Sequence, residues 1–218
     1  MPQHTTSTTE GSNVHQDSTA VKDTIRAAHR QHRAALTAQE REAAAAALAR
    51  HGLEWTRSIN NGTVGTVCVY LSVGFEPPTL RLIEALHAAG HSVLLPVCEP
   101  GRELAWVYWS PDAEFERSSF APILEPVGER HGPETAGGAV ALFIPATAVD
   151  VDGNRIGQGG GYYDKFLGHL ATAGKEIPLA AVIYDEELLP AGRIPAEVFD
   201  RPVPAVLTPG GVRELPVG

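Results

Sequence analysis

Apolar and polar residues alternate in blocks along the chain, and the spacing of the apolar positions changes from helical to strand-like near residue 63. Residues 20–35 are polar and basic with apolar positions at helical spacing, and an alanine-rich stretch follows. Thr37 and Glu40 match a capping box, in which two side chains satisfy free N–H groups at a helix start. Gly52 suits the residue just beyond a helix end. We therefore expect the chain to open with a helical hairpin.

Short apolar runs beyond Thr63 predict strands separated by helices. Runs rich in Val, Ile and Leu are typical of strands buried on both faces of a sheet. They occur at 63–72, 91–97, 104–109, 139–147, 178–186 and 204–209. Helices are predicted for 79–90, which follows Pro77-Pro78 and ends in glycine, and for 162–173. Residues 110–138 are rich in Pro, Gly and charged residues, and we expect a loop there.

This alternation of strands and helices predicts an α/β protein. We expect a three-layer, Rossmann-like fold with a mostly parallel central sheet, preceded by the N-terminal helical hairpin, in a single domain over residues 20–218. Residues 1–19 are small and polar, without the basic and apolar regions of a signal peptide, so we expect a disordered tail.

The composition narrows the class of protein. The chain has 218 residues, 43% of them hydrophobic, and its 17 basic against 26 acidic residues give a net charge of -9. No basic run or long apolar run is present, so neither a nucleic-acid partner nor a membrane span is expected. The two cysteines, Cys68 and Cys98, lie in apolar runs and are expected to be reduced core thiols. These features favour a cytoplasmic enzyme or binding protein that acts on small molecules, and we expect it to be a monomer.

The most unusual stretch is DGNRIGQGGGYYDKFL, residues 152–167, in which five glycines fall within nine residues. It lies between an apolar run and a predicted helix, where open α/β sheets bind ligands. Glycines let a ligand approach the main chain, and N–H groups at a helix start bind phosphate. A tight turn without a ligand is the alternative, and the glycines alone do not decide between them. The run is neither a Walker loop nor a GxGxxG fingerprint, because Tyr162 and Tyr163 follow Gly161.

The run from Pro145 through Asp150, Gly153, Arg155 and Gly157 to Asp164 resembles the signature of the 5-formyltetrahydrofolate cyclo-ligase family. Other stretches resemble the family in the same order, and together they span roughly residues 20–210. They are Lys22 with Arg26, Tyr70-Leu71-Ser72 with Glu76-Pro77 and Thr79, Ile123 with Glu125-Pro126, and Phe199-Asp200 with Val206-Leu207-Thr208.

The resemblance implies an enzyme that uses ATP and Mg²⁺ to cyclise 5-formyltetrahydrofolate to 5,10-methenyltetrahydrofolate, with release of ADP and phosphate. The formyl carbonyl is an amide and a weak electrophile. Phosphorylation of its oxygen creates a leaving group and lets N10 attack. Such an enzyme has mainly to position two substrates and to neutralise phosphate charge. No residue stands out as a general base, and we expect direct phosphoryl transfer without a covalent enzyme intermediate.

The resemblance also implies roles for individual residues. Those expected to bind ATP are Lys22, Arg26, Arg155, Ile156, Gly157, Gln158, Gly159, Gly160, Gly161, Tyr162 and Tyr163. Those expected to bind the folate are Arg26, Leu71, Glu76, Gln158, Gly159, Gly160, Gly161 and Tyr162. Arg155, Tyr163 and Asp164 are expected to be catalytic, and Asp164 and Asp200 to hold Mg²⁺. Without the resemblance, Lys22 and Arg26 could form a solvated helix face, and Asp164 a helix-start carboxylate.

The chain departs from the family pattern at four positions. Gln158 and Gly160 stand where some members carry basic residues, Phe199 stands in place of a histidine, and Pro204 in place of an acidic residue. Two other functions therefore stay open. One is a non-catalytic relative that sequesters 5-formyltetrahydrofolate, and the other is an ATP-using enzyme with a different acceptor.

Overall fold

A computed structural model describes the backbone of residues 10–197 and 200–216, with side chains from residue 18 onward. Phe199 and residues 1–9 lie outside the described part of the chain. The first helix, α1 (Glu10–Ala35), begins before the predicted start at residue 20. The rest of the predicted disordered tail falls on residues outside the described part, so it stays a prediction.

The core of the molecule is a seven-stranded sheet with the order β12-β11-β9-β6-β1-β2-β3. Its strands are β1 (Thr66–Val69), β2 (Ser92–Glu99), β3 (Glu103–Tyr108), β6 (Ala141–Pro145), β9 (Leu179–Val182), β11 (Ala205–Thr208) and β12 (Gly211–Glu214). The five inner strands are parallel, and β3 and β12 pair antiparallel at the two edges. The predicted, mostly parallel sheet is confirmed.

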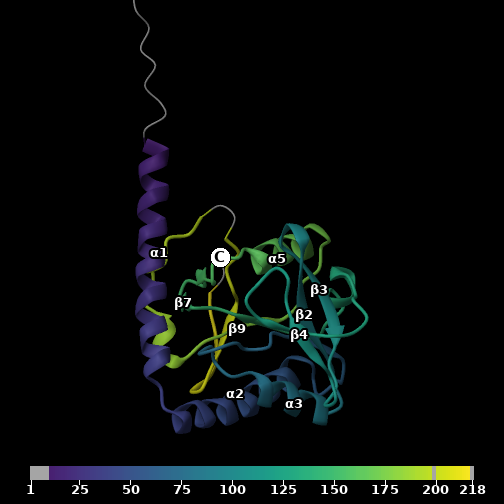
Figure 1. Ribbon diagram of the computed structural model, residues 1–218. Coiled ribbons are helices and arrows are strands. Elements are labelled where there is room, and N and C mark those ends of the chain that lie inside the picture. Colours follow the sequence, from purple (N-terminus) through teal and green to yellow (C-terminus); the bar gives the residue numbers. More distant parts are fainter. Residues whose placement is uncertain (1–9, 198–199, 217–218) are drawn as a thin grey trace, which may run out of the picture.

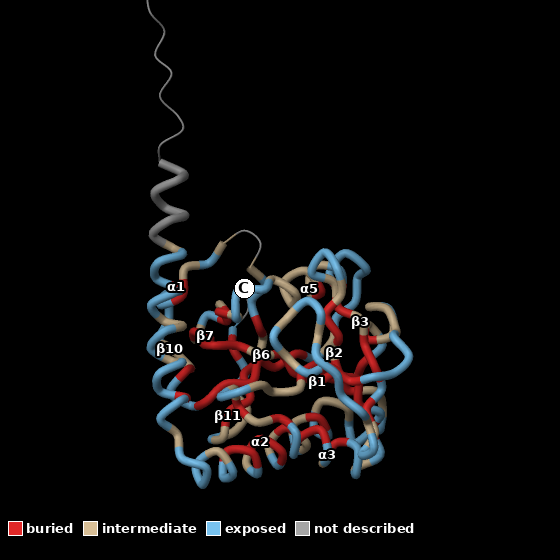
Figure 2. Tube along the Cα trace, viewed as in Figure 1, coloured by how far each residue is buried: buried red, intermediate tan, exposed pale blue. Residues whose placement is uncertain are grey.

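Helices cover both faces of this sheet (Figure 1). On one face α2 (Ala38–Ile59) and α3 (Leu80–Ala88) pack against Val67 and Val69 of β1, and Cys68 between them points to the other face. There α5 (Tyr162–Thr172) and the short α4 (Pro133–Ala136) complete the second apolar cluster. Figure 2 shows the buried residues concentrated in the strands between these helices. This is the predicted three-layer arrangement.

The helices α1 and α2 meet at a corner instead of packing side by side as a hairpin. Figure 1 shows α1 upright along one edge of the molecule and α2 lying beneath the sheet. The predicted capping box is present, because Glu40 N–H donates to Thr37 Oγ1 and Thr37 N–H donates to Glu40 Oε2. Because of this corner, α1 does not pack along α2 and instead contacts the loops at the carboxyl ends of the strands.

The prediction that α2 ends near Gly52 is wrong, because the helix continues to Ile59. Gly52 is buried against α3, and a Cβ atom there would lie 2.6 Å from Leu82 Cδ1. The glycine therefore lets two helices pack closely and does not end one of them. Replacing Gly52 by alanine forces Leu82 to move, and we expect it to lower the free energy of unfolding by about 1–3 kcal/mol, measured by urea denaturation.

The prediction of a plain loop over residues 110–138 is also wrong. This stretch contains α4 and the antiparallel pair of β4 (Phe115–Arg117) and β5 (Leu124–Pro126). Three-residue strands are too short for an alternating pattern to show in the sequence.

A second, three-stranded sheet holds the base of the glycine-rich loop. It pairs β7 (Ala148–Asp150) with β8 (Arg155–Ile156) and with β10 (Leu188–Leu189). Two 3₁₀ turns complete the elements, η1 (Pro100–Arg102) and η2 (Asp185–Glu187). Across the described part of the chain, no helix has both the length and the apolar character needed to cross a bilayer.

Candidate active site

A cleft of about 830 Å³ opens at the carboxyl ends of β1 and β6. These two strands are neighbours, but the chain leaves β1 towards β2 and leaves β6 towards β9, on opposite sides. The strand order reverses at this point, which is where open α/β sheets place their ligand sites. The fold therefore predicts a binding site between β1 and β6, independently of any motif.

Every residue that the sequence singled out for the site lines this cleft, and they come from four separate segments of the chain. They are Lys22, Arg26, Leu71, Glu76, Arg155, Ile156, Gly157, Gln158, Gly159, Gly160, Gly161, Tyr162, Tyr163, Asp164 and Asp200. The structure brings them together, while the role of each one stays a prediction.

The glycine-rich loop takes a shape that side chains would oppose. Gly159 has a φ of 93° and Gly161 a φ of 72°, both in the left-handed region that favours glycine. Gly161 is also the N-cap of α5, and it supplies no side chain to cap the first turn. Free N–H groups at the start of a helix bind anions. Because the loop and the first turn of α5 line the cleft, this end of the cleft suits phosphate.

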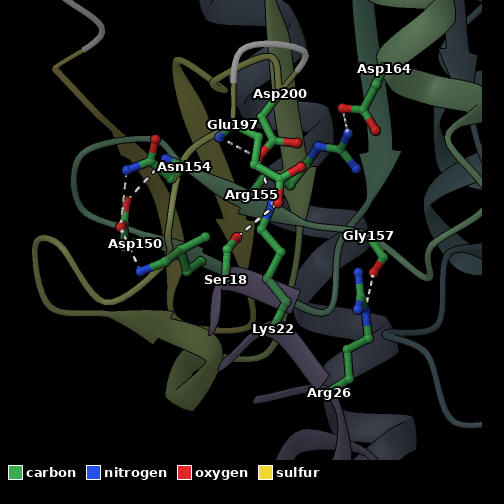
Figure 3. A network of polar contacts seen from close by, with 11 residues as sticks. Ser18, Lys22, Arg26, Asp150, Asn154, Arg155, Gly157, Asp164, Glu197 and Asp200 are labelled. Atoms are coloured by element: carbon green, nitrogen blue, oxygen red, sulfur yellow. Dashed lines mark hydrogen bonds and ion pairs between the residues drawn. The ribbon is translucent and has the colours of Figure 1, made fainter. Parts of the chain in front are cut away.

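Asp150 organises the turn that leads into the loop. It is fully buried, and its carboxylate accepts hydrogen bonds from the N–H groups of Asp152, Asn154 and Ile194 and from the Asn154 amide. Figure 3 shows Asp150 facing Asn154, away from the cations of the cleft. Asp150 therefore holds the backbone of the β7–β8 turn.

Two basic residues of the cleft, Lys22 and Arg155, are paired with acidic ones in the structure (Figure 3). Lys22 Nζ lies 2.7 Å from Asp200 Oδ2 and 3.5 Å from Glu197 Oε1. Arg155 Nη2 lies 2.5 Å from Asp164 Oδ1. The two predicted metal ligands thus contact different cations, one from α1 and one from β8.

Arg26 connects α1 to the glycine-rich loop. Its Nε donates a hydrogen bond of 3.0 Å to the carbonyl oxygen of Gly157, and its Nη1 lies 2.7 Å from Asp23 Oδ1. The position of the loop therefore depends on α1.

One buried ion pair at the cleft was not predicted from the sequence. Arg33 Nε lies 2.6 Å from Glu187 Oε1, and Arg33 Nη2 donates to Glu187 Oε2 at 2.8 Å and to the carbonyl oxygen of Ala146 at 2.8 Å. Glu187 also accepts the Tyr184 N–H. Both side chains are almost fully buried, and Arg33 lines the cleft. Arg33 lies on the same face of α1 as Lys22 and Arg26, and this helical spacing was the sequence signal that could have identified it as a cleft residue.

Glu76 and Tyr163 lie where the cleft enters the apolar core. Glu76 accepts hydrogen bonds from Val73 N–H at 3.0 Å and from Gln158 Nε2 at 3.4 Å, so it ties the first strand's loop to the glycine-rich loop. Burial raises the pKa of the Glu76 carboxyl above its ordinary value. Within the described chain, the Tyr163 hydroxyl has no hydrogen-bond partner. Burial raises the pKa of Tyr163 well above its ordinary value, so the hydroxyl stays neutral.

Both cysteines are free and buried, as predicted. Cys98 borders the cleft, and its backbone N–H donates to Glu125 Oε1 at 2.6 Å. Burial, followed by the nearby Glu125 carboxylate, raises the pKa of the Cys98 thiol to about 12. A thiol with this pKa is not a nucleophile near neutral pH.

Comparison with known proteins identifies the same family that the sequence motifs resemble. The model of the 5-formyltetrahydrofolate cyclo-ligase family matches residues 18–209. The chain is 39% identical over 153 residues to a 5-formyltetrahydrofolate cyclo-ligase of Mycolicibacterium smegmatis, covering 66% of this chain and 73% of that protein. It is 33% identical over 151 residues to the enzyme of that name from Escherichia coli, covering 68% and 80% of the two chains.

The fold is similar to that of a solved relative. The NMR structure of the 5,10-methenyltetrahydrofolate synthetase of Aquifex aeolicus superposes with a TM-score of 0.70 at 25% identity. The match covers 91% of this chain and 94% of that one. Sequence, fold and the residues gathered in the cleft agree, and the chain belongs to the 5-formyltetrahydrofolate cyclo-ligase family.

Proposed function

We propose that this protein is an ATP-dependent enzyme that cyclises 5-formyltetrahydrofolate to 5,10-methenyltetrahydrofolate, releasing ADP and phosphate. Family membership supports the reaction. The observation that carries the proposal is the convergence of four segments of the chain on one cleft. Its glycine-rich loop and helix start suit phosphate, and its Glu76 side suits a flat, hydrogen-bonding ring.

We assign one group of cleft residues to ATP and another to the folate. Lys22, Arg26 and Arg155 supply positive charge near the start of α5, where the phosphates of ATP bind. Glu76 accepts hydrogen bonds from the pterin N–H groups, and Leu71 supplies apolar contact. The glycine-rich loop contacts both groups, Arg26 through Gly157 and Glu76 through Gln158, and we expect the formyl oxygen to meet the γ-phosphate beside it.

The chemistry proceeds in two steps. The formyl oxygen attacks the γ-phosphorus and ADP leaves, which gives an iminium phosphate on N5. The N10 lone pair then attacks the formyl carbon, the N10 proton is lost, and phosphate departs with the original formyl oxygen. The protein's contribution is alignment and stabilisation of the transferring charge. We propose no covalent intermediate on a protein side chain.

Asp164 and Asp200 would hold Mg²⁺ together with the phosphate oxygens. Asp164 contacts Arg155 through Oδ1 and Asp200 contacts Lys22 through Oδ2, so each keeps a second oxygen, and their side chains are 33% and 26% exposed. Magnesium in nucleotide sites takes one or two protein carboxylates, so this donor set fits. Bound there, the ion neutralises charge on the phosphates during transfer. No group of three or more His, Cys, Asp or Glu side chains that could hold a metal gathers anywhere in the described chain, so phosphate oxygens and water would have to complete the coordination here.

The proposal is tested by following absorbance of the methenyl product when purified protein is mixed with 5-formyltetrahydrofolate. We expect product only when both ATP and Mg²⁺ are present. Tight folate binding without product would instead support a sequestering relative, an alternative that Gln158 in the loop keeps open. ATP hydrolysis that requires another acceptor would point to a different substrate.

Replacing Glu76 by glutamine is expected to separate folate binding from stability. The raised pKa means that the folded chain binds the Glu76 proton more tightly than the unfolded chain. The free energy of unfolding therefore falls as the pH rises from the ordinary pKa of a Glu carboxyl to the raised pKa of Glu76. Glutamine does not titrate, so the variant does not lose stability in this way. We expect Tm at neutral pH to be maintained or raised, and KM for 5-formyltetrahydrofolate to rise about tenfold.

Steady-state kinetics and thermal melts at two pH values check this prediction. An unchanged KM for the folate would remove Glu76 from the folate site, whatever happened to the Tm.

We further propose that the protein is a cytoplasmic monomer. A net charge of -9 supports this proposal, because a net charge far from zero keeps proteins soluble and monomeric. Light scattering of the purified protein tests the oligomeric state.

A further inference from the structure

The cleft holds an arginine that the site described above does not use. Arg30 lines the cleft on α1, one turn beyond Arg26, and it is exposed. Lys22, Arg26, Arg33 and Arg155 each contact a carboxylate. In the described part of the chain, Arg30 has no hydrogen bond or ion pair, and its guanidinium is available to a ligand.

Neighbouring contacts fix the part of the cleft that Arg30 borders. On the same helix, Arg26 contacts the glycine-rich loop at Gly157. In the next turn, the carbonyl oxygen of Arg33 accepts a hydrogen bond from Arg41, whose guanidinium lies 4.5 Å from the centre of the Phe75 ring. Along α1, Arg30 therefore lies between the residue that contacts the loop and the residue that accepts from Arg41, and both Arg30 and Phe75 line the cleft.

Among the described residues, Phe75 has one structural partner, Arg41, and is otherwise exposed at the cleft. Its side chain lines the cleft beside Glu76, yet it is 49% exposed. Arg41 covers its ring from outside the apolar core. A large aromatic ring at the rim of a cleft offers a stacking surface for an aryl group.

The substrate of the proposed reaction has two parts beyond the pterin, a benzoyl ring and one or more glutamates. The glutamates are anionic, and the arginine fork pairs with carboxylates through two parallel hydrogen bonds. The cations near the start of α5 are needed for phosphate, so the tail requires a separate positive group. Arg30 lies one turn beyond Arg26 on α1, and it lines the same cleft as the Phe75 ring.

We propose that Arg30 and Phe75 form the subsite for the benzoyl-glutamate tail of the folate, with Arg30 pairing with tail carboxylates and Phe75 stacking on the benzoyl ring. This inference rests on the proposed function. It predicts that the enzyme distinguishes substrates by their glutamate number through α1.

The test compares KM for the mono- and triglutamate forms of 5-formyltetrahydrofolate in wild type, Arg30→Gln and Arg30→Lys proteins. We expect wild type to bind the triglutamate more tightly. We expect Arg30→Gln to raise KM for the triglutamate about tenfold, because the tail loses one charged hydrogen-bonding partner. The variant should also lose most of the preference for the triglutamate over the monoglutamate. Arg30→Lys should keep part of it, and Phe75→Ala should raise KM for both forms.

Arg57→Gln is the matched control, because Arg57 is an exposed helical arginine on α2 that does not line the cleft. Its KM values should equal those of wild type. An unchanged folate KM in Arg30→Gln, or a rise confined to KM for ATP, would overturn the inference. If wild type formed no methenyl product at all, the proposed function itself would fail, which is a distinguishable result.

Discussion

Replacing Asp164 by asparagine is expected to reduce kcat/KM about a thousandfold or more while the protein stays folded. In phosphoryl transfer, groups that neutralise the moving charge contribute about 10³-fold or more to the rate. The asparagine side chain loses the negative charge needed for Mg²⁺ but keeps an oxygen that can accept from Arg155, so the contact that holds it in place survives in part.

Absorbance kinetics at several Mg²⁺ concentrations, with circular dichroism to check folding, measure this effect. Glu103→Gln is the control, because Glu103 pairs with Lys165, the residue after Asp164, without lining the cleft. We expect that variant to retain wild-type activity. Full activity of Asp164→Asn would exclude Asp164 from the metal site.

Replacing Glu187 by alanine is expected to have the largest effect on stability. The Arg33–Glu187 pair is buried, with side chains that are 4% and 0% exposed. Removing one partner leaves the guanidinium buried without its counter-ion, which typically costs about 3–5 kcal/mol. Because Arg33 also anchors the end of β6 through Ala146, we expect KM for ATP to rise as α1 loosens.

Urea denaturation of three variants separates charge from packing. The double variant Arg33→Met/Glu187→Leu removes both charges and should recover most of the lost stability. Glu42→Ala breaks the exposed Arg81–Glu42 pair and should cost less than about 1 kcal/mol. A loss below about 1 kcal/mol in Glu187→Ala would contradict the importance assigned to the buried pair.

The sequence predicted the parts of the fold whose signals are local. The capping box at Thr37 and Glu40, the buried parallel strands and the helix that follows Gly161 all depend on neighbouring residues, and the structure contains them. Gly52 shows the limit of local reasoning. The same residue can end a helix or let another helix approach, and only the position of Leu82 decides between these uses.

The site was predictable as a set of residues but not as a set of contacts. The motifs identified the residues that line the cleft. They did not indicate that Arg33 would be buried, because Glu187 lies 154 positions away and no local pattern links them. Nor did they show that Asp200 would pair with Lys22, since both were expected to serve the nucleotide and its metal.

The attachment of α1 also determines when the site can form during synthesis. Lys22 and Asp200 are 178 positions apart, so the ribosome releases α1 long before its partner exists. The sheet and its other helices can begin to fold in the meantime, because β1, α3 and β2 are consecutive in sequence. We infer that docking of α1 is a late event and that a nascent chain lacking the region around Asp200 has no complete cleft.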